Sequence, residues 1–256
     1  MFGVIGLGVV GGAVQKGLNC PGYDKYKDSD SFEKVAEAST IFLCLPTLYS
    51  QVDGEYDKTA IHDVCTRLND MKYSGLIVLK STVEPGTTES LNRLYENLKI
   101  VHNPEFLTAR TALDDFRNQQ HIVVGTDGHD ITELLEYFRN TYTDNITVCK
   151  SKESESMKIM CNSFYAVKVQ LFNEFYLTCK DMDISFDVVR SAMLKNNWIN
   201  PMHTDVPGPD GRMSYGGMCF PKDTNALLRH MMRHQTPHAV LKGAVDEQME
   251  MRGFDE

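Results

Sequence analysis

Residues 2–11 read Phe2-Gly3-Val4-Ile5-Gly6-Leu7-Gly8-Val9-Val10-Gly11, a short apolar run followed at once by three spaced glycines. The spacing Gly-x-Gly-x-x-Gly between a strand and a helix is typical of a dinucleotide-binding turn. The first glycine makes the turn, the second admits a pyrophosphate, and the third lets helix and strand pack closely. The helix N-terminus then faces the phosphates. A glycine-rich βα turn that holds no ligand is the alternative interpretation.

A dinucleotide site also requires an acidic residue for the ribose, roughly 20 residues after the first glycine and at the end of the second strand. Asp24 lies 18 residues after Gly6 and is the candidate, with Asp28 and Asp30 as weaker alternatives. Because the intervening stretch is short, we expect either a clipped first helix or a very brief second strand. An acid here, rather than an arginine, favours NAD over NADP, and Lys25 completes this candidate cofactor segment.

Beyond this segment, apolar runs alternate with helical stretches up to about residue 150. The uninterrupted run Thr40-Ile41-Phe42-Leu43-Cys44-Leu45 is typical of a strand buried on both faces of a parallel sheet. Strands that alternate with helices predict an α/β fold with a Rossmann-like, doubly wound parallel sheet. Further strands are expected at 75–80, 99–101, 121–125 and 145–149, and helices at 31–38, 57–71, 89–97 and 131–139.

Three polar segments fall at predicted strand ends, namely Pro46-Thr47, Ser81-Thr82 and Asn103-Pro104-Glu105. Ligands of such sheets bind at the carboxyl ends of the strands. We therefore expect Pro46, Thr47 and Thr82 to lie at the cofactor edge.

From about residue 151 the alternation gives way to one long helix, expected over 153–180 and about 42 Å long at 1.5 Å per residue. Its apolar residues extend beyond one stripe, which indicates burial on several sides or against a partner subunit. Lys158 and Asn162 are four residues apart and so share a face. A surface lysine beside a tolerated asparagine is the alternative interpretation.

Helices continue over 187–194 and, after an irregular loop over 200–215, to about Met251. The change of pattern predicts two domains. The first is an NAD-binding Rossmann domain over 1–150, and the second is an all-helical domain over 151–256.

The segment Gly216-Gly217-Met218-Cys219-Phe220-Pro221-Lys222-Asp223 holds a cysteine behind a glycine pair. Two glycines allow a tight turn and the close approach of a substrate. Pro221 is tolerated in the first turn of a new helix, so we expect Cys219 at or just before a helix N-terminus, where the dipole favours a thiolate. Asp223, one turn further on, is placed to handle a proton or to hold a water beside the sulfur. A buried, inert cysteine is the alternative interpretation.

The composition restricts the class of protein. A net charge of −9 argues against a nucleic-acid or anionic-membrane surface. No apolar run approaches the roughly 20 residues of a membrane span, and no signal peptide is expected because its cleavage would destroy the glycine motif. The seven cysteines form neither Cys-x-x-Cys pairs nor Cys/His clusters, which argues against a metal site, and their odd number suits a reducing cytoplasm.

In combination, these segments resemble the UDP-glucose/GDP-mannose dehydrogenase family along nearly the whole chain. Several separate motifs in the right order are far more specific than any one of them. The matching segments are Gly6 to Gly11, Ser81-Thr82-Val83-Glu84-Pro85-Gly86-Thr87, Asn103-Pro104-Glu105-Phe106-Leu107, Lys158 with Asn162, Asn173-Glu174, and Gly216 to Asp223.

The resemblance implies an NAD-dependent enzyme that oxidises the C6 alcohol of a nucleotide sugar, UDP-glucose first among them, to the acid in two hydride transfers. It implies that Cys219 attacks the intermediate aldehyde, giving a thiohemiacetal and then a thioester that water hydrolyses. Lys158 and Asn162 would stabilise the oxyanion. Asp223 and Thr82 would hold the water and relay protons.

The resemblance also implies a sugar site and a subunit contact. Glu105 would assist the hydrolysis, and the long helix over 153–180 would form the interface of a homodimer. The residues expected to line the sugar site are Glu105, Phe106, Leu107, Lys158, Asn162, Tyr215 and Gly216.

Two departures from the family pattern bear on these expectations. Ala109, followed by Arg110, stands where the family usually has a second glutamate, so hydrolysis is expected to be slower or to rely on Glu105 alone. Family members also carry a third domain that grips the nucleotide. For this chain we expect the nucleotide to be held by another subunit or protein, to be held weakly, or not to be required.

Two alternatives to the four-electron reaction remain open. One is a two-electron dehydrogenase that acts on a smaller sugar or a hydroxy acid, which would release an aldehyde or ketone. The other is a non-catalytic subunit that binds NAD or a nucleotide sugar and works with a complete enzyme.

Overall fold

The computed structural model describes residues 1–252, and these residues form two units. Unit 1 comprises residues 1–50 and 55–158, and unit 2 comprises residues 51–54 and 159–252. The predicted domains, 1–150 and 151–256, differ slightly from these units, and their functional assignment stays a prediction. The last four residues of the predicted second domain lie outside the described residues.

Unit 1 is built on a seven-stranded sheet with the order β2-β1-β3-β6-β7-β8-β9. Every neighbouring pair is parallel except β7 and β8, which meet in antiparallel register at His102 and Gly125. The expected doubly wound sheet is confirmed, with this one antiparallel pair as a departure. The strands are β1 (Phe2–Ile5), β2 (Gly22–Tyr23), β3 (Thr40–Leu43), β6 (Leu76–Leu79), β7 (Lys99–His102), β8 (Ile122–Gly125) and β9 (Ile146–Cys149).

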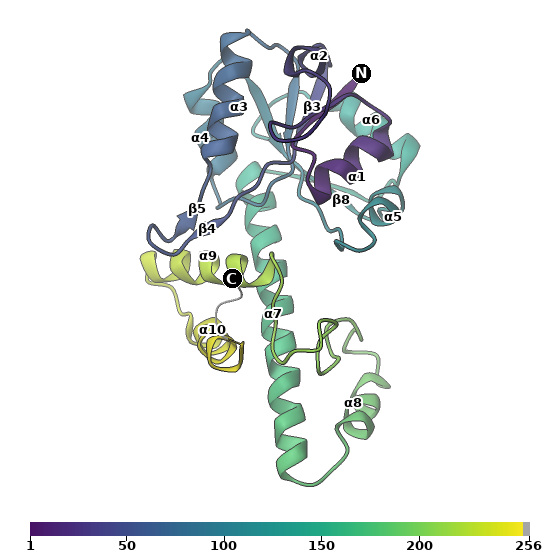
Figure 1. Ribbon diagram of the computed structural model, residues 1–256, viewed down its shortest axis with the longest axis vertical. Helices are drawn as coiled ribbons and strands as arrows, with labels where there is room; N and C mark the ends of the chain where they lie inside the picture. Colours follow the sequence, from purple (N-terminus) through teal and green to yellow (C-terminus); the bar gives the residue numbers. More distant parts are fainter. Residues whose placement is uncertain (253–256) are drawn as a thin grey trace. The chain divides into compact units, whose positions relative to one another are not determined.

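The alternation of side chains along the strands gives this sheet two hydrophobic cores. Ile5 and Ile41 face one core, and their chain neighbours Val4 and Phe42 face the other. Figure 1 shows α2, α3 and α4 on one side of the sheet and α1, α5 and α6 on the other. The helices are α1 (Val9–Leu18), α2 (Phe32–Ala36), α3 (Thr59–Asp70), α4 (Thr87–Leu94), α5 (Ala112–Arg117) and α6 (Thr132–Thr141).

Two small features of this region do not appear among the expected elements. The first is the hairpin of β4 (Tyr49–Ser50) and β5 (Glu55–Tyr56). The second is α5, whose Phe116 ring packs against α1 so closely that a Cβ at Gly17 would lie 2.4 Å from it. Gly17 is therefore required for the packing of α1 on α5.

Unit 2 is helical. Helix α7 (Ser151–Asp181) runs for 31 residues, slightly longer than the predicted 153–180, and its residues from 159 onward belong to this unit. A cluster of Phe172, Cys179 and Phe186 joins α7 to α8 (Phe186–Leu194), and a second cluster of Leu228, Leu241 and Val245 joins α9 (Phe220–Arg233) to α10 (Ala239–Arg252).

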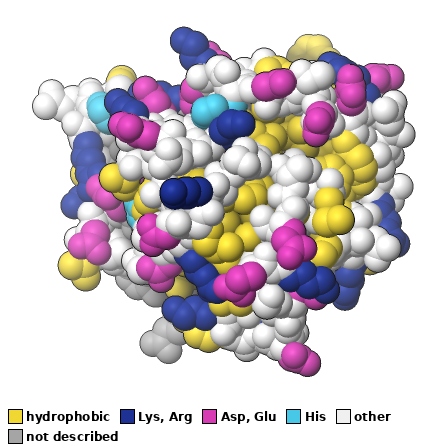
Figure 2. Space-filling view, turned by 90° about the horizontal axis from the view of Figure 1, so that it is seen from above, with side chains coloured by type: hydrophobic (Ala, Val, Ile, Leu, Met, Phe, Trp, Pro, Cys, Tyr) yellow, Lys and Arg dark blue, Asp and Glu magenta, His cyan; other side chains and the backbone are white. Residues whose placement is uncertain are grey.

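The described surface carries charges of both signs. On the face seen in Figure 2, Lys and Arg side chains lie interspersed with Asp and Glu side chains around apolar patches. Such a mixture differs from the basic stripe that is typical of nucleic-acid-binding proteins. Among residues 1–252, none of the helices has the length and hydropathy that a bilayer crossing requires.

Candidate functional site

Backbone atoms lie close against two glycines of the glycine turn in unit 1. Gly6 has φ +89°, and a Cβ there would lie 2.4 Å from the Cys44 carbonyl oxygen. A Cβ at Gly11 would lie 1.7 Å from the Gly6 carbonyl oxygen. By contrast, a Cβ at Gly8, the N-cap of α1, would meet no atom within 4 Å. The chain needs Gly6 and Gly11 for its own packing, and Gly8 leaves an open backbone for a ligand.

Asp24 directly follows β2 and faces this turn. Its Oδ2 accepts a hydrogen bond from the Leu7 backbone N–H at 2.8 Å, and its Oδ1 accepts from the Tyr26 N–H at 2.9 Å. Asp24 lies at the end of the second strand, as expected, and β2 has only two residues, one of the two outcomes that the short spacing allowed. The role of Asp24 toward a ribose stays a prediction. Lys25 is exposed, with Nζ 5.8 Å from the centre of the Tyr26 ring.

The loops that follow β3 and β6 are hydrogen-bonded to each other. Thr47 donates through its hydroxyl to the Thr82 carbonyl at 2.7 Å, and the Ser81 hydroxyl both accepts from Leu45 N–H at 2.9 Å and donates to the Leu45 carbonyl at 2.8 Å. Thr47 is buried and Pro46 is exposed. These bonds gather three of the candidate cofactor residues at one edge of the sheet.

Lys80 is a buried residue that the sequence analysis did not single out. Its Nζ donates to Oδ1 of Asn103 at 2.8 Å and to the Asn103 carbonyl at 3.2 Å, which ties the end of β6 to the loop after β7. Burial lowers the pKa of Lys80 to about 8. Burial, followed by the nearby Lys80 charge, lowers the pKa of His102 to about 3, so this imidazole is neutral. In the sequence, the sign of this burial was the position of Lys80 at the end of an apolar strand.

Glu105 and Lys158 form an ion pair within unit 1. Lys158 Nζ lies 3.2 Å from Glu105 Oε1, and the two side chains are 5% and 11% exposed. The same Nζ lies 5.2 Å from the centre of the Phe106 ring, and Glu105 Oε2 accepts from the Leu107 N–H at 2.6 Å. Four of the residues expected at the sugar site, Glu105, Phe106, Leu107 and Lys158, are therefore neighbours.

Cys219 and Asp223 occupy the first turn of α9 in unit 2. Cys219 is exposed and is the N-cap, as predicted, with Pro221 in the first turn of the helix. Asp223 is fully buried, and its Oδ2 accepts from Asn162 Nδ2 at 2.6 Å. Its Oδ1 forms an ion pair with Lys222 Nζ at 2.5 Å. The exposed thiol thus lies one turn from a buried carboxylate.

Tyr215 lies with its ring inside unit 2. Its hydroxyl is 3.5 Å from both Thr224 Oγ1 and the Ala244 carbonyl oxygen, and burial raises the pKa of the phenol. The whole residue is only 2% exposed, so Tyr215 is enclosed within unit 2. The next residue, Gly216, is half-buried.

Within each unit, the structure places some of the candidate residues close to one another. Unit 1 holds the glycine turn with Asp24, the Thr47–Thr82 loops, and the Glu105–Lys158 pair. Unit 2 holds Cys219, Asn162 and Asp223. Within residues 1–252 no group of three or more His, Cys, Asp or Glu side chains is arranged to hold a metal ion.

Two models of one protein family match the chain. The model of the UDP-glucose/GDP-mannose dehydrogenase family NAD binding domain matches residues 22–143, and the model of the family's central domain matches residues 152–248. Together they cover most of the sequence.

Individual relatives agree with these matches. UDP-glucose 6-dehydrogenase of Rhizobium meliloti (strain 1021) is 29% identical over 224 residues, which are 82% of this chain and 50% of that protein. UDP-glucose 6-dehydrogenase AglM of Haloferax volcanii is 30% identical over 242 residues, which are 87% of this chain and 55% of that protein. The chain therefore spans about half the length of these curated relatives.

A solved structure is similar over nearly the whole chain. It is a UDP-glucose dehydrogenase from the hyperthermophilic archaeon Pyrobaculum islandicum, with a TM-score of 0.84 and 27% identity. The match covers 97% of this chain and 68% of that one.

Proposed function

Because this chain belongs to the UDP-glucose/GDP-mannose dehydrogenase family, we propose that it oxidises the C6 alcohol of a nucleotide sugar to the carboxylate with NAD as the oxidant. UDP-glucose is the first candidate substrate, since the relatives with matching sequences are UDP-glucose 6-dehydrogenases. The observation that carries the proposal is the first turn of α9, where the exposed Cys219 is the N-cap residue and the buried Asp223 carboxylate follows one turn later.

The residues of unit 1 suit a dinucleotide. The open backbone at Gly8 allows the close approach of a pyrophosphate to the N-terminus of α1, and Asp24 lies against the same turn. When bound, NAD would accept one hydride at each of the two oxidation stages. The residues proposed to hold it are Gly6, Leu7, Gly8, Val9, Val10, Gly11, Asp24, Lys25, Pro46, Thr47 and Thr82.

Cys219 is the proposed nucleophile. After the first oxidation, its sulfur adds to the carbonyl carbon of the aldehyde, and the oxygen becomes the alkoxide of a thiohemiacetal. Loss of a hydride from that carbon leaves a thioester. Water then adds, the C–S bond breaks, and the thiolate leaves with its electron pair, so the sugar acid is released and Cys219 is restored.

Further residues are proposed to stabilise the charges and to transfer the protons of these steps. Lys158 and Asn162 would donate hydrogen bonds to the developing oxyanion. Lys158 would supply a preorganised positive charge, and Asn162 a neutral donor. Asp223 would take a proton from the attacking water, with Thr82 as a relay, and Glu105 would assist the hydrolysis. Phe106, Leu107, Tyr215 and Gly216 would line the sugar.

We also propose that the protein is a homodimer in a reducing cytoplasm. Several large apolar side chains of α7 are exposed, among them Met160 at 56% and Phe164 at 65%, and such a surface favours a partner. All seven cysteines are thiols, which suits a reducing compartment. Sedimentation of the wild type beside Phe164→Glu tests the dimer, because a charge on this surface should yield monomers.

The decisive experiment measures NADH formation with purified protein, NAD and a panel of nucleotide sugars. Two NADH per sugar, abolished in Cys219→Ala but not in Cys149→Ala, is the expected result. One NADH per sugar with release of an aldehyde or ketone would instead identify a two-electron dehydrogenase. NAD binding without turnover on any sugar would favour a binding subunit that works with a complete enzyme.

A further inference from the structure

The loop that leads into the glycine pair before Cys219 is held by polar side chains of two helices. Ser214 donates through its backbone N–H to Asn173 Oδ1 at 2.9 Å and through its hydroxyl to Gln170 Oε1 at 2.5 Å, both on α7. Gln248 of α10 donates to the Tyr215 carbonyl at 3.4 Å. Ser214 itself has a left-handed backbone, with φ +61°. The path of this loop is therefore imposed by its neighbours in unit 2.

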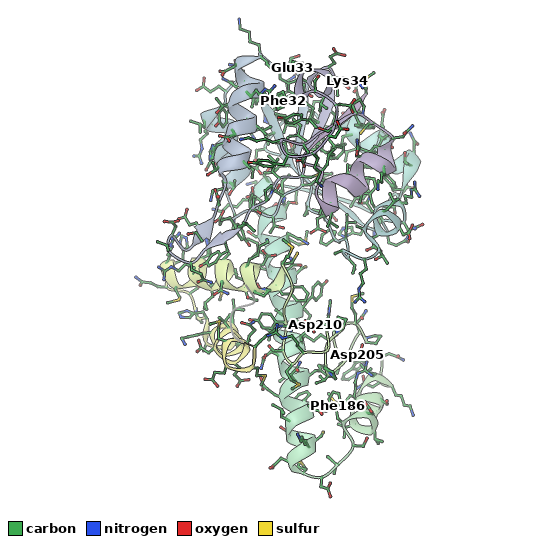
Figure 3. All side chains as sticks on the ribbon, viewed as in Figure 1. Phe32, Glu33, Lys34, Phe186, Asp205 and Asp210 are labelled. Atoms are coloured by element: carbon green, nitrogen blue, oxygen red, sulfur yellow. The ribbon has the colours of Figure 1, made fainter. Side chains whose placement is uncertain are left out.

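Arg252, the last residue of α10, also holds this loop. Its Nη1 donates to the carbonyls of Met213 at 3.2 Å and Ser214 at 3.1 Å, and its Nη2 forms an ion pair with Asp210. Asp210 is labelled in Figure 3, on the loop between α8 and α9. The Arg252 side chain is only 3% exposed. One planar guanidinium thus serves two backbone carbonyls and a carboxylate, an arrangement that an ammonium group does not reproduce.

The guanidinium also lies directly against the glycine pair. A Cβ added at Gly216 would lie 2.2 Å from Arg252 Cζ. The following Gly217 has φ +77°, and Cys219 caps α9 two residues later. A side chain at position 216 would therefore have to displace the guanidinium from its place.

We propose that Arg252 is a positioning residue for Cys219. It sets the path of residues 213–217 and so keeps the sulfur at the N-terminus of α9, where the helix dipole favours the thiolate. Arg252 lies beyond residues 152–248, which the central-domain model matches. The inference deepens the proposed function and rests on it insofar as Cys219 is the nucleophile.

The test is the reactivity of Cys219 toward iodoacetamide as a function of pH, followed on the Cys219 peptide by mass spectrometry. This measurement needs neither NAD nor sugar, so its result is readable even if the protein turns over no nucleotide sugar. In Arg252→Met we expect alkylation at neutral pH to slow by about threefold or more, with the midpoint of the pH profile moved upward. Arg252→Lys should be shifted in the same direction but less.

A matched control separates positioning from general stability. Arg190 ties an earlier part of the loop between α8 and α9, through Thr204 Oγ1 at 2.9 Å and Asp205, rather than residues 213–217 directly before Cys219. Arg190→Met should leave the Cys219 profile unchanged while lowering the melting temperature.

The proposal fails if folded Arg252→Met keeps the wild-type Cys219 profile, because Arg252 would then serve stability alone. Should Arg252→Met not fold, Arg252→Lys decides the question. That variant keeps the charge beside Asp210 but cannot serve the three acceptors together, so an unshifted Cys219 profile in it would equally overturn the proposal.

Discussion

Asn162 on α7 donates its side-chain amide to Asp223 of α9 across 2.6 Å, and Asp223 is completely buried. The second carboxylate oxygen is paired with Lys222 Nζ at 2.5 Å. A buried charge is tolerated only when it is compensated in this way. The contact therefore joins two helices of unit 2 and holds the carboxylate one turn from the cysteine.

The first prediction concerns this carboxylate. Asp223→Asn should lower the free energy of unfolding by about 2 kcal/mol, because it weakens two charge-assisted hydrogen bonds in a buried place. If Asp223 also handles a proton, turnover should fall by about a hundredfold or more. Chemical denaturation and NADH formation measure the two effects. In the control Asp246→Asn, which breaks an exposed pair with Lys242, both quantities should stay near the wild type.

The second prediction concerns the Glu105–Lys158 pair. Glu105→Gln or Lys158→Met alone should cost about 3 kcal/mol of unfolding free energy, since each leaves a buried charge without its counter-ion. The double variant should recover part of that loss, so a double-mutant cycle should give a coupling energy of about 1–3 kcal/mol. The same cycle on the exposed Arg67–Glu33 pair should give far less. Additive losses at Glu105 and Lys158 would contradict the prediction.

The third prediction concerns Glu155, a buried carboxylate at the N-terminus of α4. It accepts from the Thr88 N–H at 2.7 Å, from the Thr88 hydroxyl at 2.6 Å and from the Gly86 N–H, yet burial raises its pKa to about 7. The folded protein therefore binds a proton more tightly than the unfolded chain does. Stability should fall as pH rises from about 4.5 to about 7, by up to about 3 kcal/mol.

Denaturant unfolding across this pH window tests the prediction. Glu155→Gln cannot ionise and should remove most of the decline. The control Glu153→Gln, two residues earlier and exposed, should keep the wild-type slope. Equal slopes in Glu155→Gln and the wild type would show that another group is responsible.

The fourth prediction separates cofactor binding from folding at the glycine turn. A Cβ at Gly8 meets nothing within 4 Å, so Gly8→Ala should fold normally. It should nevertheless weaken NAD binding by about tenfold or more, because the added methyl occupies the backbone surface that the pyrophosphate approaches. Calorimetric titration with NAD measures the loss.

The control for that prediction is another glycine of the same helix. The nearest atom to a Cβ at Gly12 is the Leu7 carbonyl oxygen at 3.9 Å, so Gly12→Ala should keep NAD binding and stabilise α1 by up to about 1 kcal/mol. Unchanged NAD affinity in Gly8→Ala would argue that this turn does not receive the cofactor.

Much of the fold follows from local patterns in the sequence. The glycine spacing, the apolar run at 40–45 and the regular alternation predicted the sheet, because buried parallel strands are uniformly apolar. The β4–β5 hairpin was missed because strands of two residues are too short to show a period, and the six-residue helix α5 was also missed.

The candidate site was predictable where its residues lie close in sequence. Cys219 as N-cap of α9 follows from Pro221, and the place of Asp24 follows from its distance to Gly6. Lys80 was missed because its position at the end of an apolar strand suggests burial but does not reveal its partner Asn103. Arg252 was missed because it lies 42 residues from its partner Asp210, and no sequence period links residues so far apart.

The glycine turn also bears on how this sequence can diverge. Gly6 and Gly11 are required by the backbone atoms that surround them, whether or not a dinucleotide is bound. Gly8 faces open space, so the packing of the chain does not require a glycine there, and the proposed dinucleotide would be what constrains it. In a descendant that abandoned its cofactor, selection would retain Gly6 and Gly11 and release Gly8. A substitution at position 8 is therefore the sequence change that we expect after a loss of dinucleotide binding, while the fold persists.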